Sequence, residues 1–271
     1  MTLHQVTVAD GLGLAVAEGG KADGRPILFL HGFGQSQRVF HGQFHGPLAA
    51  EFRLLALDLR GHGASGRPDD AAAYGDGPHW GDDVAAVRRA LGLQGVVLAG
   101  WSYGGAVLAD HVAGHGTDGI DGTVFVGACP LLGKAAAPYM GPDARAHFPA
   151  ILSDDVAAQE VGARALALAL GKRDGGEVES AVADTMSVPL AARRAMMRRR
   201  TDHAATLGAL DRPALVIHGS ADGVVLPAMA DWLGRTLPDA VVRLYEGVGH
   251  APFAEDAARF DADLAAFVRG L

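Results

Sequence analysis

The sequence predicts an α/β protein with a mostly parallel sheet, helices on both faces of the sheet, and a helical insertion. Its 271 residues lie within the length range that α/β enzymes fill as one domain. Apolar residues make up 49% and charged residues 20% of the chain, which is typical of a globular protein and not of a disordered one. Short apolar segments alternate with helical patterns, and this alternation predicts the parallel sheet.

The chain begins with a predicted β-hairpin. Residues 3–8 and 12–17 alternate or carry β-branched side chains on either side of the turn Asp10–Gly11. Residues 27–30 are continuously apolar and precede glycines, as in a parallel strand buried on both faces. Further strands are expected at residues 53–57, 96–99, 124–126, 214–217 and 241–244. Helical patterns lie between most strands, at residues 40–50, 82–91, 106–115, 228–236 and 257–268.

The alternation of strands and helices stops after Cys129–Pro130 and resumes at Arg212–Pro213. Between them lie helical stretches rich in Ala, Arg and Met, and we expect prolines to break these stretches. The prolines concerned are Pro138, Pro142, Pro149 and Pro189. An insertion between two strands of one sheet must leave and re-enter at the sheet edge. We therefore predict a core of residues 1–130 and 207–271, and a helical cap of residues 131–206.

Composition also excludes several classes of partner. The formal net charge of −8 argues against a nucleic-acid partner. The apolar stretches are far shorter than the roughly 20 residues that span a bilayer, so no membrane partner is expected. Neither a signal peptide nor a second cysteine to pair with Cys129 is visible. We expect a cytoplasmic protein, and the sequence leaves its oligomeric state open.

Residues 100–104 (GWSYG) form the sharpest motif of the sequence. They follow an apolar strand and begin a helical pattern, which is the context of a nucleophile elbow. The glycines allow a sharp turn that presents the hydroxyl of Ser102. The alternative is a Gly/Ser turn in which Ser102 only caps a helix. Because of the context, we interpret Ser102 as a catalytic nucleophile.

A serine nucleophile needs a base, and the base needs an acid that orients it. Asp222 follows the predicted strand 214–217, and His250 follows the next strand and precedes the last helix. This is the chain order, serine then acid then histidine, that the elbow motif leads us to expect. The alternative is a turn-forming aspartate and a surface histidine. We predict that Ser102, Asp222 and His250 form a triad.

Backbone amides at two positions are candidates for an oxyanion hole. One is the amide of Tyr103, which follows the nucleophile, and the other is that of Phe33, in the glycine loop after strand 27–30. Two N–H groups aimed at one point stabilise the negative oxygen of a tetrahedral intermediate. The alternative is a glycine turn in which Phe33 only covers the core.

Together these segments resemble the α/β-hydrolase fold superfamily. The resemblance rests on residues 31–34 (HGFG), 58–65 (DLRGHGAS), 100–105 (GWSYGG), 218–222 (HGSAD) and 249–250 (GH). It implies a mostly parallel sheet of eight strands with the triad beneath a helical cap. The chain is similar to Ser-His-Asp esterases, lactonases and cofactor-free haloperoxidases or perhydrolases. Ser102 argues against dehalogenases and epoxide hydrolases, which have an aspartate at this position.

The predicted function is hydrolysis of a small to medium carboxylic ester through an acyl-enzyme, without metal or organic cofactor. Alternatives on the same triad are lactone opening, perhydrolysis and carbon–carbon cleavage, and the non-enzymatic alternative is a ligand-binding receptor. We expect a mostly apolar substrate pocket. Its predicted residues are Trp101 and Phe253 beside the triad, with cap residues around Tyr139–Met140, Phe148 and Met196–Met197 as the distal wall. We interpret the arginines at 193–194 and 198–200 as a solvated helix face.

Overall fold

The computed structural model describes residues 1–171 and 175–271 and contains one eight-stranded sheet. The strand order is β1-β2-β4-β3-β5-β6-β7-β8. The pairs β1–β2 and β2–β4 are antiparallel, and every neighbouring pair from β4 to β8 in this order is parallel. The strands are β1 Thr2–Thr7, β2 Gly13–Gly20, β3 Pro26–Leu30, β4 Arg53–Leu57, β5 Val96–Trp101, β6 Ile120–Val126, β7 Ala214–Gly219 and β8 Ala240–Tyr245. The predicted fold class is confirmed.

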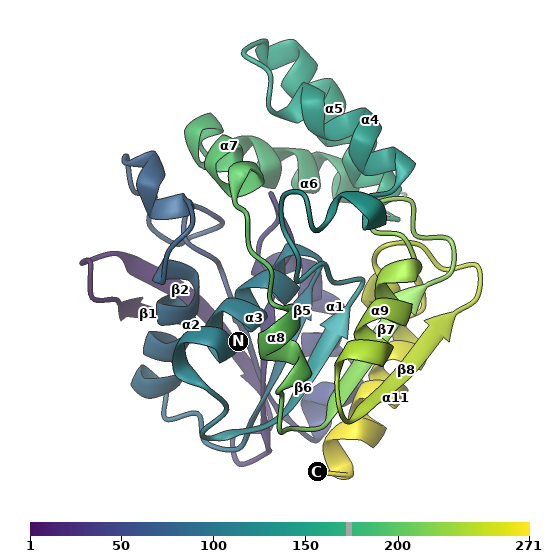
Figure 1. Cartoon of the computed structure of the whole chain (residues 1–271). Helices are drawn as coiled ribbons and strands as arrows, with labels where there is room; N and C mark the ends of the chain where they lie inside the picture. The colour runs from purple at the N-terminus through teal and green to yellow at the C-terminus, as the bar shows by residue number, and fades with distance from the viewer. Residues whose placement is uncertain (172–174) are drawn as a thin grey trace.

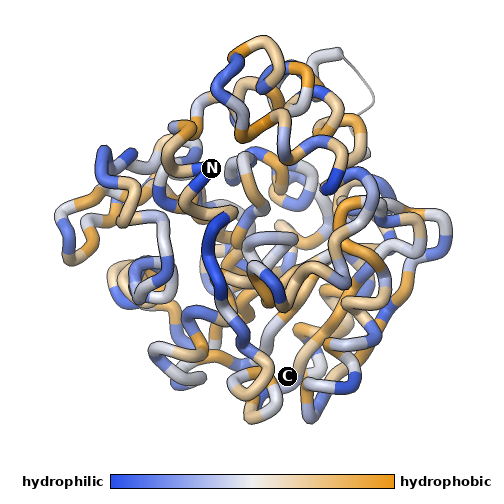
Figure 2. Tube along the Cα trace, turned by 45° about the horizontal axis from the view of Figure 1, so that its top comes forward, coloured by the Kyte–Doolittle hydropathy of each residue, from blue (hydrophilic) through white to orange (hydrophobic). Residues whose placement is uncertain are grey.

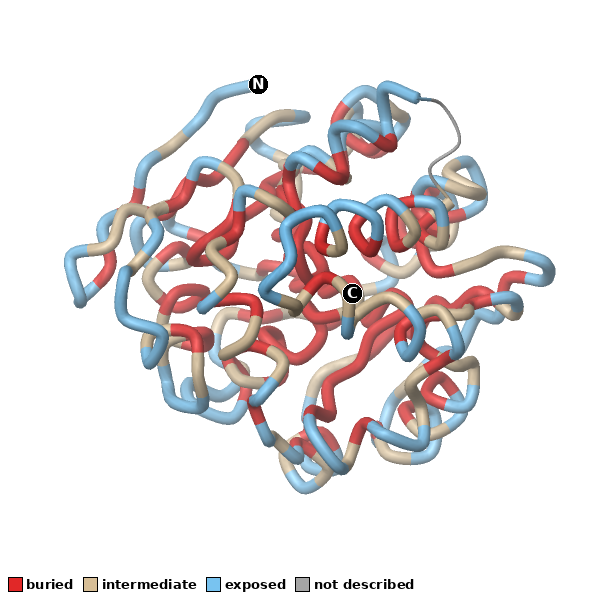
Figure 3. The backbone as a smooth tube through the Cα atoms, turned by 90° about the horizontal axis from the view of Figure 1, so that it is seen from above, coloured by how far each residue is buried: buried red, intermediate tan, exposed pale blue. Residues whose placement is uncertain are grey.

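Helices cover both faces of the sheet (Figure 1). One face carries α2, α3, α8 and α9, and the other carries α1, α10 and α11. Their bounds are α1 His41–His45, α2 His79–Ala90, α3 Tyr103–His115, α8 Ala204–Gly208, α9 Ala228–Thr236, α10 Pro252–Glu255 and α11 Ala257–Arg269. Short 3-10 helices lie at Gln37–Phe40, Pro47–Ala50, Ala71–Tyr74 and Ala137–Tyr139. The central strands are mostly hydrophobic and buried, and exposed residues lie around the rim (Figures 2 and 3).

One predicted helix is wrong as a continuous element. Residues 40–50 form the end of a 3-10 helix, then α1, and then a second 3-10 helix. Gly46 has an extended backbone (ψ −172°) and Pro47 starts the second piece. Proline lacks a backbone N–H and is tolerated only in the first turn of a helix. The helix therefore cannot continue through Gly46 and Pro47.

Residues between β6 and β7 contain no strand in their described part. They form helices α4 Pro142–Ile151, α5 Val156–Ala169, α6 Gly175–Ser187 and α7 Leu190–Arg198, grouped at one end of the sheet (Figure 1). Contrary to expectation, Pro149 lies inside α4, near its end. Helix α8 packs on α3 and α9, so it lies in the helical layer of the core although it overlaps the expected cap boundary.

The parallel strands bring their carboxyl ends to a common edge. Leu30 pairs with Gly100, Gly100 with Phe125, and Val126 with Ile217. The loops that follow β3, β5, β6 and β7 therefore meet on the side where α4–α7 lie. No helix in the described part of the chain combines the length and apolar character that membrane crossing requires.

Candidate active site

Ser102 lies at a sharp turn between β5 and α3. Among the described residues it is the only non-glycine residue with positive φ (53°), and such a conformation is strained. The turn also brings backbones unusually close together. A Cβ at Gly104 would lie 2.1 Å from the carbonyl oxygen of Leu30, so only glycine fits there. The elbow that the motif predicted is therefore present in the backbone geometry.

Asp222 is buried and its carboxylate accepts four polar contacts. Oδ1 accepts the backbone N–H groups of Val224 (2.8 Å) and Val225 (2.9 Å). Oδ2 lies 2.7 Å from His250 Nδ1 and 3.1 Å from His218 Nε2. Burial alone would raise the pKa of Asp222, but the charge of His250 and the hydrogen bonds from both histidines outweigh it. The resulting pKa lies well below its usual range, so this carboxyl is a carboxylate at neutral pH.

His250 is oriented by its bond to Asp222 and by its own loop. With the Nδ1–H donated to the carboxylate, Nε2 is left free to accept a proton, which is the tautomer that a general base needs. The indole N–H of Trp101 donates to the His250 carbonyl at 2.8 Å. Glu255 accepts the backbone N–H groups of Gly249 and Ala251, each at 3.0 Å. The loop is thus fixed on both sides of the imidazole.

The loop after β3 passes directly beside the serine. A Cβ at Gly32 would lie 3.1 Å from Ser102 Cβ. Two buried histidines hold this loop: His31 Nε2 accepts the N–H of Leu59 (3.1 Å), and His62 Nε2 accepts that of Gly34 (3.3 Å). Burial lowers the pKa of His31 to about 4. Burial and the nearby His31 lower that of His62 to about 3, so both rings are neutral.

The two amides predicted for the oxyanion hole are unoccupied donors. In residues 1–171 and 175–271, the backbone N–H groups of Phe33 and Tyr103 donate to no other protein group. Both residues line the same cavity as Ser102. Unpaired N–H groups in a largely buried site are uncommon in folded proteins. A substrate oxygen could satisfy them.

The cavity beside Ser102 has a volume of about 200 Å³. It is lined by the predicted distal residues Met140, Phe148 and Met196, and its lining residues carry no charged side chain. Trp101 and Phe253 are not in the lining, which corrects the expectation for this pair. The two rings pack on each other in the core at 5.0 Å, where Trp101 supports the His250 loop.

Several lining residues were missed by sequence reasoning. Val224 and Val225 line the cavity, and their signal was their position two and three residues after Asp222. Met197 lines the cavity as expected for the distal wall, whereas Tyr139 does not. Leu132 also lines the cavity, and no sequence signal marked it. Cys129 also lines it, and burial raises the pKa of its thiol to about 12, which agrees with a packed residue rather than a nucleophile.

The arginine run is not a solvated face, because two of its members are buried. The side chain of Arg199 is fully buried and bonds the hydroxyl of Tyr103 (2.9 Å) and Asp110 (2.6 Å). Arg193 is buried among carbonyls and Gln159 inside the insertion. Helical spacing cannot reveal a partner that lies far away in the sequence. Within the described residues, no group of three or more His, Cys, Asp or Glu is arranged to hold a metal ion.

A strained serine at a strand-to-helix turn, in an α/β sheet of this topology, defines the class of α/β hydrolases. The chain belongs to this family: the model of the alpha/beta hydrolase family matches residues 27–263. This match and the similar proteins below confirm two expectations: the chain is a member of the α/β-hydrolase superfamily, and it is a hydrolytic enzyme.

Three similar proteins illustrate the family. The solved structure of an esterase from Rhodococcus sp. ECU1013 is 33% identical, with a TM-score of 0.94 and full coverage of both chains. A non-heme haloperoxidase from Rhodococcus erythropolis is 30% identical over 97% of this chain and 98% of its own. A bifunctional esterase/perhydrolase from Acinetobacter calcoaceticus is 38% identical over 127 residues, 47% of this chain and 45% of its own.

Proposed function

We propose that this protein is a serine hydrolase that cleaves small to medium carboxylic esters through an acyl-enzyme. The observation that carries the proposal is the convergence of three groups on one apolar cavity. Ser102, Phe33 and Tyr103 line the same cavity, and the backbone N–H groups of Phe33 and Tyr103 make no hydrogen bond to another described residue. A carbonyl carbon near Ser102 Oγ would thus have its oxygen near two donors, which is the arrangement that acyl transfer requires.

The reaction would proceed in two balanced halves. Ser102 Oγ attacks the ester carbonyl while His250 Nε2 takes the hydroxyl proton, and the amides of Phe33 and Tyr103 bind the oxyanion. The alcohol leaves with the proton from His250. Water then attacks the acyl-enzyme with His250 as base, which releases the acid and restores Ser102. Asp222 stays ionised and stabilises the imidazolium.

One contact in this mechanism is part of the proposal alone. Among the described residues, the hydroxyl of Ser102 makes no hydrogen bond, to His250 or to any other group. The His250 carbonyl accepts the indole N–H of Trp101, the residue that precedes Ser102. Catalytic hydrogen bonds are often long before substrate binds. We infer that the Ser102–His250 bond forms when an acyl group fills the cavity.

The cavity supports a neutral substrate. Its lining consists of apolar, aromatic and sulfur-containing side chains together with Ser102 and glycine. A charged acyl group would lose its hydration there without gaining an ionic partner. We therefore propose a small neutral ester, bound by the wall of residues 131–206 acting as a cap. Lactones share the same carbonyl chemistry and belong in the same substrate panel.

The test is turnover of p-nitrophenyl esters of graded acyl length, together with lactones, by wild type and by Ser102→Ala. Turnover that Ser102→Ala abolishes supports the enzyme. Binding without turnover in wild type would instead indicate a receptor that retains the fold, and turnover that survives Ser102→Ala would refute the nucleophile.

Perhydrolysis is the second candidate, favoured by the similarity to the esterase/perhydrolase. In this reaction hydrogen peroxide, rather than water, attacks the acyl-enzyme, and a peracid leaves while Ser102 is restored. Peracid formation from an ester and hydrogen peroxide, compared with ester hydrolysis in the same sample, measures the partition between the two. A product that is all carboxylic acid would exclude it.

A further inference from the structure

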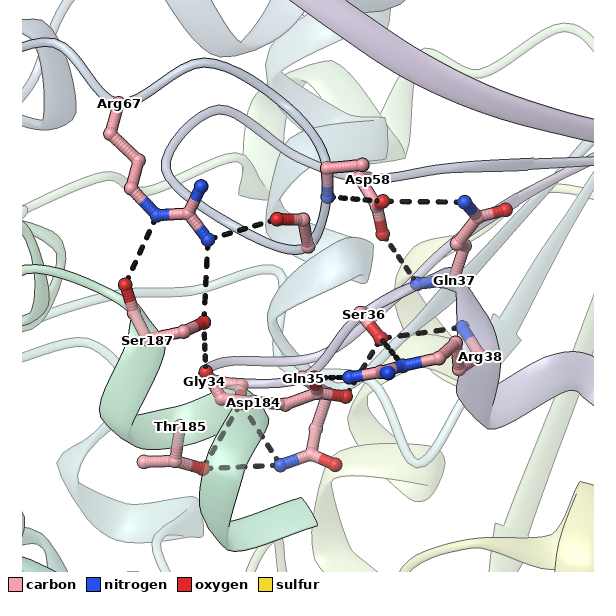
Figure 4. Close-up of polar contacts among 12 residues, drawn as sticks. Gly34, Gln35, Ser36, Gln37, Arg38, Asp58, Arg67, Asp184, Thr185 and Ser187 are labelled. Carbon is pink, nitrogen blue, oxygen red and sulfur yellow. Dashed lines mark hydrogen bonds and ion pairs between the residues drawn. The ribbon is translucent and has the colours of Figure 1, made fainter. Parts of the chain in front are cut away.

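Helix α6 contacts the loop that follows β3, although it lines no part of the cavity. The hydroxyl of Thr185 donates to the carbonyl of Gly34 at 3.0 Å and accepts from Gln35 Nε2 at 3.3 Å (Figure 4). Thr185 is 1% exposed. The packing is so close that a Cβ at Gly34, whose φ is +68°, would lie 3.0 Å from Thr185 Oγ1. Helix α6 therefore packs directly against Gly34, the residue that follows Phe33.

The preceding residue of α6 strengthens this contact. The carboxylate of Asp184 accepts the hydroxyl of Ser36 at 2.7 Å and also pairs with Arg38 (Figure 4). Asp184 and Ser36 are both buried, so the bond between them is shielded from solvent, whereas the Arg38 side chain is 64% exposed. Gly34 is held from the opposite side, because its N–H donates to the neutral His62 of the core. The loop is thus clamped between the core and α6.

A second contact from the insertion reaches the other proposed oxyanion residue. Arg199 directly follows α7 and donates from Nη1 to the hydroxyl of Tyr103 at 2.9 Å. Its Nη2 donates to Asp110 on α3 at 2.6 Å. The guanidinium also lies over the rings of Trp80 (5.4 Å) and Tyr103 (5.7 Å). A planar cation held by two hydrogen bonds and two rings has a single orientation.

We propose that the insertion positions both donors of the oxyanion hole, with Thr185 and Arg199 as its positioning residues. Thr185 fixes the loop that presents the Phe33 amide, and Arg199 fixes the first residue of α3, which presents the Tyr103 amide. The proposal rests on the proposed function. It extends that function because the cap then contributes to transition-state stabilisation, in addition to shaping the acyl pocket.

Kinetics can distinguish a role in positioning the oxyanion donors from a role in shaping the acyl pocket. Loss of an interaction that acts only on the oxyanion lowers kcat and leaves KM nearly unchanged. The same loss weakens binding of a trifluoromethyl ketone that carries the acyl chain of the substrate. In that adduct, Ser102 Oγ bonds to the ketone carbon, the hydroxyl proton moves to His250, and the ketone oxygen becomes the oxyanion. A pocket role would instead change KM and the preferred acyl length.

The variants are Thr185→Val, which removes the hydroxyl at equal volume, and Arg199→Lys, which keeps the charge but not the planar fork. Thr185→Ser retains the donor and should restore activity. Two matched controls exist in the insertion. Thr201→Val removes a buried hydroxyl that has no hydrogen-bond partner among the described residues. Arg193→Lys changes a buried arginine whose bonds stay within the insertion.

We expect Thr185→Val and Arg199→Lys each to lower kcat about tenfold and to raise the ketone Ki by the same factor, since loss of a whole donor costs about 10²–10³. KM should stay within about twofold, and both controls should match wild type. If Thr185→Val does not fold, as thermal unfolding would reveal, Thr185→Ala carries the same test. Wild-type kcat and Ki in both variants, equal losses in the controls, or losses confined to KM would overturn the proposal.

The same experiment separates this inference from the proposed function. If Ser102→Ala retains ester turnover, the proposed function fails and the positioning roles fail with it. If Ser102→Ala is inactive while Thr185→Val and Arg199→Lys behave like the controls, only the positioning roles fail.

Discussion

The sheet edge and the helical insertion meet at one cavity but hold their residues in different ways. At the sheet edge, Asp222 and His250 are fixed by short hydrogen bonds to each other and to backbone groups. The insertion contributes Met140, Phe148 and Met196, apolar side chains held by packing alone. Methionine has three rotatable bonds and adapts to irregular space. The comparison teaches that the proposed reacting groups have one geometry, whereas the wall of the cavity can change shape at small cost.

This contrast predicts the largest effects at the sheet edge. Ser102→Ala and His250→Ala should each lower kcat at least about 10³-fold, because nucleophile and base act in one step. The double variant should be little worse than either single variant. Steady-state and single-turnover kinetics on one ester measure all three. Losses that add in free energy would show that the two residues do not share a step.

Substitutions in the insertion should change the choice of substrate more than the chemistry. Met140→Ala, Phe148→Ala and Met196→Ala should shift the preference between acyl lengths by about 10- to 200-fold in kcat/KM, since one methylene in an apolar pocket is worth about 1–3 kcal/mol. The rate of Ser102 labelling by a small phosphonate should change less. Kinetics on the graded ester panel measure both.

Met186→Ala is the matched control for the wall substitutions. Met186 is a partly buried methionine of α6 in the same insertion, but it lies outside the cavity lining. The Met186→Ala variant should rank the esters of graded acyl length in the same order as wild type. An unchanged ranking in all three wall variants would place the acyl pocket elsewhere.

The buried histidines of the sheet edge should make the core sensitive to acid. The pKa values of His31 and His62, about 4 and about 3, lie below the ordinary value near 6.5. As the pH falls below 6.5, the unfolded chain therefore takes up protons first, and stability is lost. At pH 5 each ring should cost about 2 kcal/mol of unfolding free energy. Urea unfolding at pH 7 and pH 5 measures this loss.

His62→Gln sharpens the same prediction. This variant should lose about 2 kcal/mol less between pH 7 and pH 5 than wild type does, whatever its stability at pH 7. A wild-type slope in His62→Gln would mean that this ring does not remain neutral in the folded protein.

The smallest expected effect is that of metal removal. Ester turnover should be unchanged after EDTA treatment, because the proposed chemistry uses only Ser102, His250, Asp222 and backbone amides. Turnover in the metal-free sample, with and without added divalent ions, checks this. Activity that EDTA removes and one divalent ion restores would contradict the proposed mechanism.

Sequence patterns alone determined the fold class and the order of the chemical motifs. Each motif follows an apolar strand, and the carboxyl ends of parallel strands share one edge, so Ser102, Asp222 and His250 could be assigned to that edge without coordinates. The glycine pattern around Ser102 also predicted its strained turn, because close backbone approach leaves no alternative to glycine. These are local signals joined by one rule of topology.

Tertiary structure alone decided which side chains face the cavity and which contacts cross from the insertion to the core. Trp101 and Phe253 flank the motifs in sequence but pack together in the core. Arg199 belongs to the arginine run that the sequence predicted to be a solvated helix face. It is instead buried against Tyr103, which lies 96 positions earlier. Thr185 and Gly34 are 151 positions apart. Burial of a long or polar side chain depends on partners brought together by folding, and neither helical periodicity nor residue type encodes where those partners lie.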